Sequence, residues 1–135
     1  MVEIKMSNPA SLGKPLGPYC QVSRVKASEL VFIAGQTATD KDGKIIGAGD
    51  LDAQCKQVFA NIEAALHSVG GTWANVVHFT NYLVNRDDQP QFVKYRLGVF
   101  PAMFPNGAYP PNTILFIDKL LHKEFLVEVQ AIAAL

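Results

Sequence analysis

Apolar residues recur every three or four positions between residues 51 and 69, and this spacing predicts an amphipathic helix. Asp50 stands at the expected N-cap, where its side chain can accept a hydrogen bond from a free backbone N–H group. Gly70 and Gly71 come next, and glycine is common just beyond a helix C-terminus. The apolar stripe needs a sheet to cover, and it consists of Leu51, Cys55, Val58, Phe59, Ile62, Leu66 and Val69.

Several segments have the alternating or β-branched composition of strands, and the first two are predicted to form a hairpin. This hairpin would join Gln21–Lys26 to Leu30–Ala34 through a turn at Ala27-Ser28-Glu29. Another turn is predicted over residues 39–44, where Asp and Gly favour a chain reversal. The remaining predicted strands are Val76–Val84, Thr113–Ile117 and Phe125–Ala133.

A second helix is predicted to begin at Asp87-Asp88-Gln89-Pro90, because acidic residues and an early proline favour a helix N-terminus. It should run to about Phe100, since Pro101 lacks the N–H group that continues a helix. Residues 104–111 are rich in proline and are predicted to form a loop. The order β-β-α-β-α-β-β predicts a single α+β domain over residues 1–135.

The predicted strand at 76–84 is apolar on both of its faces. One face carries Val77, Phe79 and Leu83, and the other carries Val76, Tyr82 and Val84. The helices of so small a protein cover one face of a sheet, so we expect another subunit to cover the second face.

Composition and charge narrow the choice of partner and compartment. Twelve basic residues balance twelve acidic ones and are scattered along the chain, so nucleic acid is not the expected partner. The chain has neither a secretory apolar segment nor the roughly 20 apolar residues of a membrane span, which predicts a soluble protein without membrane contact. Cys20 and Cys55 are in no metal or redox spacing; free thiols in a reducing cytoplasm are the simplest interpretation, and a lone disulfide is the alternative.

Five motifs in order resemble the Rid family (YjgF-like, reactive-intermediate deaminase). Residues 17–21, Gly-Pro-Tyr-Cys-Gln, are similar to the entry motif of this family, and residues 30–36, Leu-Val-Phe-Ile-Ala-Gly-Gln, to its first central strand. Ala53-Gln54 with Asn61-Ile62, the strand at 76–84 and the closing segment 125–133 continue the match. The resemblance therefore extends over nearly the whole chain.

The resemblance implies a chorismate-mutase-like mixed sheet that is backed by two helices and assembled into a homotrimer. Ligands of this family bind in clefts between subunits, and its best-studied members hydrolyse enamines and imines made by pyridoxal-phosphate enzymes. Neither a metal nor a cofactor takes part in that reaction. Water attacks an electrophilic iminium carbon, so the protein has to orient substrate and water and to move protons.

Three residues match pocket positions of the family. The match implies that Tyr19 packs on or hydrogen-bonds the ligand, that Gly35 offers backbone groups, and that Glu128 is the catalytic residue that orders the attacking water. Each residue also has a simpler interpretation. Glu128 could be an interface carboxylate and Tyr19 a packing residue in a turn.

Four further site positions depart from the family pattern. Asn112 replaces the arginine that binds a substrate carboxylate, Ala34 replaces a serine, and Phe92 and Ile114 stand for an asparagine and a cysteine. An amide cannot reproduce a two-pronged ion pair, so affinity for a small 2-imino acid should fall. We therefore expect a larger or less acidic ligand, with Phe92 as an apolar wall of the cleft. In the simpler interpretation, Asn112 caps loop backbone.

Three functions compete on these grounds. The first is a hydrolytic deaminase of altered specificity, acting for example on an aminomuconate-like catabolic intermediate. The second is a non-catalytic trimer that binds or senses a metabolite. The third is RNA cleavage, a label attached to some relatives, and the balanced charge argues against it. Nucleophilic catalysis by Cys20 with a histidine as base is disfavoured, because the spacing pairs no histidine with it.

Overall fold

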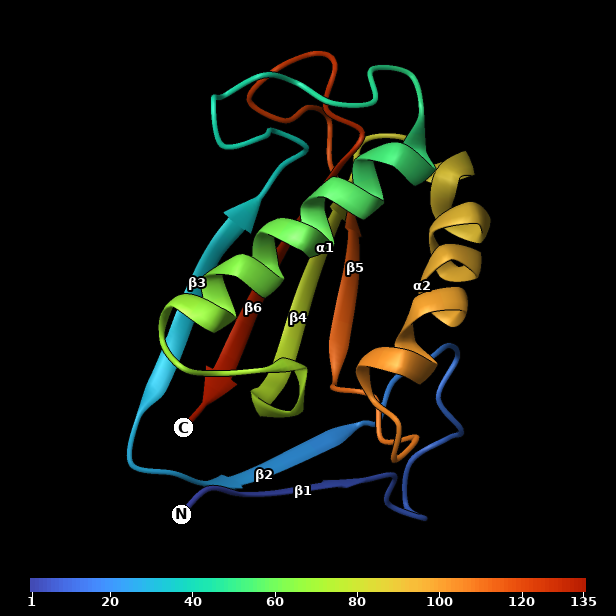
Figure 1. Ribbon diagram of the computed structural model, residues 1–135. Helices are drawn as coiled ribbons and strands as arrows, with labels where there is room; N and C mark the ends of the chain where they lie inside the picture. The colour runs from blue at the N-terminus through green and yellow to red at the C-terminus, as the bar shows by residue number, and fades with distance from the viewer.

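The computed structural model describes all 135 residues as a mixed four-stranded sheet with both helices on one face and a separate two-stranded sheet at one end (Figure 1). The strand order in the larger sheet is β3-β6-β4-β5, in which β4 and β5 are parallel and the other pairs antiparallel. This is the predicted α+β architecture. The elements are β1 (Glu3–Ser7), β2 (Val22–Lys26), β3 (Leu30–Gln36), α1 (Leu51–Ser68), the 3₁₀ turn η1 (Trp73–Asn75), β4 (Val76–Leu83), the 3₁₀ turn η2 (Arg86–Asp88), α2 (Gln89–Met103), β5 (Asn112–Phe116) and β6 (Val127–Ala134).

Helix α1 begins and ends as its sequence predicts. The side chain of Asp50 accepts a hydrogen bond of 3.0 Å from the backbone N–H of Ala53. Gly70 has a φ of 78°, and the N–H of Gly71 donates to the carbonyl of Leu66 at 2.9 Å. Local signals are enough to fix this helix because both of its ends are closed by neighbouring residues. Neither helix has the length and apolar composition that crossing a membrane requires.

The predicted hairpin between β2 and β3 is wrong. Strand β2 pairs with β1, which the sequence did not reveal, whereas β3 pairs with the C-terminal strand β6. The segment between them does not close a hairpin turn, because the N–H groups of Ser28 and Glu29 both donate to the carbonyl of Leu135 at 3.0 Å. Solvent exposure explains why β2 and β3 belong to different sheets: β2 has no buried residue, whereas β3 buries Ile33 in the core.

Helix α2 continues past the predicted end at Phe100 and includes Pro101. The proline cannot donate to the carbonyl of Leu97, but both residues are exposed, so water can reach that carbonyl. The N–H of Phe104 then donates to the carbonyl of Phe100 at 2.7 Å and closes the last turn. The proline is tolerated because it lies on the solvent side of the helix.

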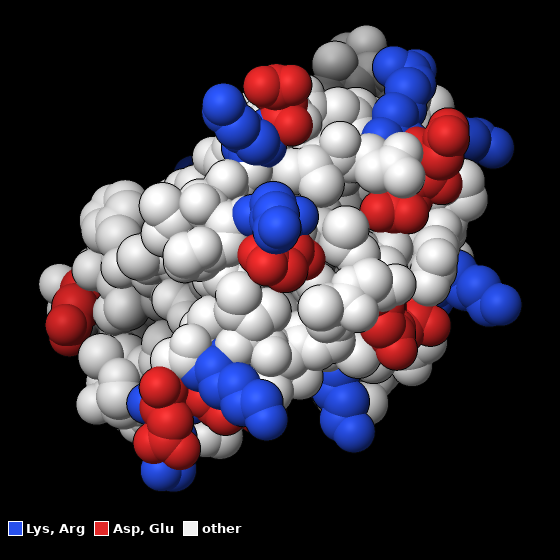
Figure 2. Space-filling view, turned by 90° about the horizontal axis from the view of Figure 1, so that it is seen from above, with Lys and Arg blue, Asp and Glu red and all other residues white.

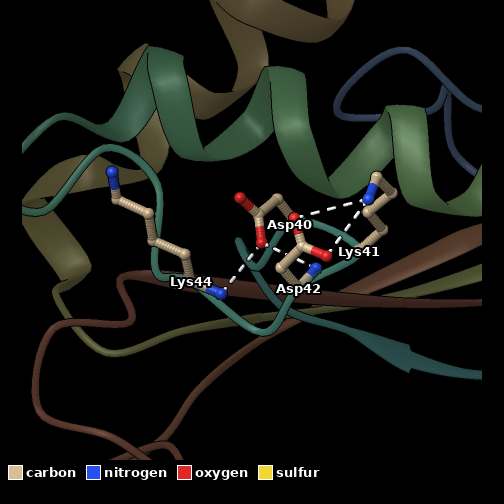
Figure 3. Close-up of polar contacts among 4 residues, drawn as sticks. All are labelled: Asp40, Lys41, Asp42 and Lys44. Carbon is tan, nitrogen blue, oxygen red and sulfur yellow. Dashed lines mark hydrogen bonds and ion pairs between the residues drawn. The ribbon is translucent and has the colours of Figure 1, made fainter.

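The turn predicted at residues 39–44 is present and is held by Asp40 (Figure 3). One oxygen of Asp40 accepts hydrogen bonds from the backbone N–H of Asp42 at 3.0 Å and of Lys44 at 2.9 Å. Gly43 has a φ of 80°, which side-chain-bearing residues rarely adopt. The ordered turn leads the chain from β3 toward the start of α1.

The two faces of the larger sheet differ in cover. The face below the helices is packed with aromatic rings, including the stacked pair Phe79 and Phe100 at 6.0 Å between centroids. The opposite face has no helix over it (Figure 1), and there Phe32 is 72% exposed and Leu30 54% exposed. These side chains come from β3, whereas the uncovered apolar face was predicted for β4, which β6 separates from β3 and which has no exposed residue.

Candidate functional site

A cavity of about 210 Å³ lies at the edge of the larger sheet, where β5 begins beside the first half of α2. The loop that precedes β2 closes its outer side. Ligand pockets usually measure about 300–1,000 Å³, so this cavity suits a small molecule. Its lining residues are Leu16, Gly17, Tyr19, Gln89, Val93, Arg96, Asn112, Thr113 and Ile114. It therefore brings together Tyr19, Asn112 and Ile114 of the predicted site.

Tyr19 is held by backbone contacts on both sides. Its hydroxyl accepts a hydrogen bond of 3.1 Å from the N–H of Leu16, which fixes the ring against its own turn. The N–H of Cys20 donates to the carbonyl of Tyr109 at 2.8 Å and ties the segment to the loop after α2. The tyrosine thus packs in a turn, as its simpler interpretation requires, and also lines the cavity.

Arg96 is the residue that the sequence analysis missed. It lies on α2 and is only 1% exposed. Its guanidinium lies over the ring of Phe92, at 4.6 Å from the centroid, and 5.7 Å from that of Phe100. Its spacing in the sequence could have identified it. Arg96 is four residues from each of these phenylalanines, which places it in the middle of a buried helical stripe.

The charge of Arg96 has no anionic partner in the chain. None of the ion pairs in the structure includes it, and its Nε atom has no hydrogen-bond partner. Burial lowers the pKa of Arg96 to about 10, which leaves the side chain charged at neutral pH. Burial also raises the pKa of the neighbouring Cys55 thiol to about 12, so that thiol is neutral and supplies no counter-charge.

Asn112 connects Arg96 to the sheet. Its Oδ1 atom accepts hydrogen bonds from Nη1 of Arg96 at 3.0 Å and from Nδ2 of Asn81 at 3.1 Å. Asn81 also donates to the carbonyl of Thr113 at 3.1 Å. The Nδ2 atom of Asn112 is buried without a partner. Asn112 is therefore bonded to side chains and does not cap loop backbone, and its N–H groups are free.

Gly35 and Glu128 form a second group, on β3 and β6. A Cβ atom on residue 35 would lie 2.8 Å from Cδ of Glu128 and closer still to Oε1, so only glycine admits this carboxylate. Glu128 is opposite Tyr82 in the β4–β6 pair, and the Tyr82 hydroxyl donates to Oε1 of Gln130 at 2.9 Å. Ala34 precedes Gly35 and is exposed. Of the predicted site residues, Gly35 and Glu128 are thus in contact within one chain, with Ala34 next to Gly35 in sequence.

The two groups of predicted residues are not brought together within one chain. Glu128 does not line the cavity, and strand β4 lies between β6 and β5. Phe92, expected as a wall of the cleft, is wholly buried beneath Arg96 and does not line the cavity. That expectation needs correction, because the helical position of Phe92 turns it into the core, where it supports the guanidinium.

The structure adds nothing in favour of a cysteine nucleophile. Both cysteines are free, and no histidine is hydrogen-bonded to Cys20. No group of three or more His, Cys, Asp or Glu residues is placed to hold a metal ion.

Comparison with known proteins identifies the family. The family model described as endoribonuclease L-PSP matches residues 10–135. A RutC family protein of Pyrococcus horikoshii is 37% identical over 121 residues, with 89% of each chain covered. A RutC family protein of Synechocystis is 32% identical over 133 residues and covers 98% of this chain and 97% of its own. The chain belongs to the endoribonuclease L-PSP family, which confirms the resemblance read from the motifs.

A solved structure supports the same assignment. A Rid family protein of unknown function from Yersinia pestis matches with a TM-score of 0.86 and 27% identity, and 98% of each chain is covered. The fold is therefore the one expected for Rid proteins. Membership of this family is compatible with a deaminase-like or an endoribonuclease-like role.

Proposed function

We propose that the protein is a hydrolytic deaminase that acts on a small reactive enamine or imine. The observation that carries this proposal is the contact between Gly35 and Glu128, because the missing side chain at position 35 leaves room for a carboxylate against the backbone of β3. A positioned carboxylate is a common general base and contributes about 10²–10⁴-fold to a rate. Ala34 beside it is exposed, so a ligand can approach this carboxylate from the face without helices.

In the proposed reaction, water adds to the carbon of the iminium form of the substrate. A C–O bond forms while Glu128 takes one proton from the water, and the electron pair of the C=N bond moves to nitrogen. Glu128 then returns that proton to the nitrogen. The C–N bond breaks and ammonia leaves, the hydroxyl proton passes to the ammonia to give ammonium, and the hydroxyl oxygen becomes a carbonyl. The sum is one iminium ion and one water giving one carbonyl compound and one ammonium ion.

A second copy of the chain would complete this site. The face that carries Leu30, Phe32 and Glu128 has no helix over it, and an exposed apolar surface of this kind favours association. We propose a homotrimer in which this face of one subunit adjoins the cavity beside Asn112 of its neighbour. The small volume of that cavity is in keeping with a site of which a neighbour forms one wall. With two free cysteines, the cytoplasm is the proposed compartment.

The endoribonuclease role named in the family description has less support from this surface. Figure 2 shows acidic and basic side chains interspersed over the face it presents, without a continuous basic area. The chain as a whole has no net charge. Binding to a phosphate backbone depends on clustered Lys and Arg residues, so small metabolites are the better-supported ligands.

A non-catalytic, metabolite-binding trimer is the second candidate. Asn112, at the position where deaminating relatives are expected to have arginine, favours it. An assay of ammonia release from a panel of enamines and imines decides between the two, with Glu128→Gln as the test variant and the exposed Glu29→Gln as the matched control. We expect the wild type and Glu29→Gln to release ammonia at equal rates and Glu128→Gln to be at least about 100-fold slower. If no substrate reacts faster than in buffer, yet metabolites raise the melting temperature, the binding protein is correct.

A further inference from the structure

We propose that the cavity beside Asn112 binds the carboxylate of a small anionic ligand, with the guanidinium of Arg96 as the counter-ion. As a statement about substrates, this rests on the proposed function. It reverses the expectation of a less acidic ligand, which followed from the presence of Asn112 alone. The guanidinium is provided by α2 instead of β5.

The charge of Arg96 is unbalanced within the chain. Arg96 is 1% exposed, yet no carboxylate lies within ion-pair distance. Removing one cation from water costs several kcal/mol, and buried arginines are therefore normally paired with an anion. The surrounding groups are the rings of Phe92 and Phe100, the amide of Asn112 and the neutral thiol of Cys55. None of these is an anion, so a ligand is the remaining source of negative charge.

Arg96 and Asn112 also have hydrogen-bond donors that are free. Nη1 of Arg96 is 3.0 Å from Oδ1 of Asn112, so the guanidinium and the amide are adjacent. Nε of Arg96 and Nδ2 of Asn112 have no hydrogen-bond partner, and both residues line the cavity. A planar guanidinium next to an amide N–H group offers several donors toward the two oxygens of a carboxylate.

Hydrogen bonding within the chain does not require the charge of Arg96. If Arg96 were absent, Oδ1 of Asn112 would still accept the hydrogen bond from Asn81 at 3.1 Å. No buried acceptor would lose its only donor. Replacing an unpaired buried charge with an apolar side chain of similar length generally leaves stability unchanged or raises it. Because the charge is not needed for internal hydrogen bonding and is costly to bury, its presence favours a role in ligand binding.

The test uses two probes of nearly equal shape, propionate and propionamide, of which only the first is charged. NMR titration of the full-length protein would measure the affinity of each for the wild type, for Arg96→Met and for Lys94→Met. Lys94 is exposed on the same helix and does not line the cavity, so it controls for loss of one positive charge. We expect propionate to bind the wild type and Lys94→Met at least about tenfold more tightly than propionamide. Arg96→Met should lose this preference and keep or raise its melting temperature.

Equal affinity of the wild type for both probes would overturn the proposal, as would undiminished propionate binding by Arg96→Met. If Arg96→Met does not fold, the wild type still decides: propionate, but not propionamide, should shift the Nε resonance of Arg96. The deaminase proposal fails separately. Binding of propionate through Arg96 without ammonia release from any imine refutes the deaminase alone. Equal rates for imines with and without a carboxylate refute the carboxylate site alone.

Discussion

The cavity beside α2 and the strand face around Gly35 contain unpaired charges of opposite sign. The cavity contains a buried guanidinium without an anion, whereas the strand face contains the carboxylate of Glu128, which takes part in no ion pair. Strand β4 separates the two regions within a chain. In our proposal, each region is one half of a polar site: the first is suited to hold an anion and the second to move protons. Contact between copies of the chain is the simplest way to join them.

The largest effect is expected from Asn112→Arg, which places a second guanidinium against Arg96. Two like charges without an anion should lower the free energy of unfolding by about 3–5 kcal/mol. Urea denaturation measures this change. The double variant Asn112→Arg, Arg96→Asn exchanges the two side chains and should recover most of the loss. An unchanged free energy of unfolding in Asn112→Arg would mean that the cavity already balances the charge of Arg96.

Phe32→Asp should have the next largest effect, on the assembly. Phe32 is 72% exposed in one chain, and burying such a ring in an interface contributes about 1.5–3 kcal/mol, all of which a buried carboxylate would forfeit. Sedimentation velocity should report monomers and ammonia release should disappear. Leu97→Asp is the control, because Leu97 is 53% exposed on the far side of α2 and should leave the assembly intact. Full activity in a monomeric Phe32→Asp variant would show that one chain suffices.

Gly35→Ala should have the smallest effect on the fold and a specific effect on the reaction. Its methyl group would displace the Glu128 carboxylate, which costs little stability because the carboxylate ends a flexible side chain, but should slow the reaction roughly 100-fold. Binding of propionate should not change, since its proposed donors, Arg96 and Asn112, lie on α2 and β5 and residue 35 offers none. Gly98→Ala is the matched control, because a Cβ atom there meets nothing within 4 Å and alanine favours the helix. Loss of propionate binding in Gly35→Ala would show that the substitution disturbs more than the position of the Glu128 carboxylate.

Local signals predicted the parts of the fold that local contacts determine. Helix α1 begins after Asp50 and ends before Gly70 as expected, because capping interactions act within one turn of the helix. The hairpin prediction failed because β3 pairs with β6, about 100 residues later in the chain, and no short-range pattern encodes that choice. Pro101 was taken as a helix end, although its position on the solvent side lets the helix continue.

The candidate site was predicted in part for the same reason. Glu128 and Gly35 were named from motifs and lie in contact, because strand alternation and pairing keep them on one face. Arg96 was overlooked because the family motif directs attention to position 112, whereas the guanidinium arrives from a helix 16 residues earlier in sequence. Only tertiary packing shows that these two positions meet.

Because the guanidinium of Arg96 belongs to α2, ligand recognition depends on the position of that helix relative to the sheet. Arg96 rests on Phe92 and Phe100 of its own helix, while Asn112 belongs to the sheet. A small slide of α2 would change the spacing of the donors without altering either side chain. Core substitutions far from any bound molecule are thus expected to change ligand selectivity by shifting α2. An arginine on a strand of the sheet would not respond in this way.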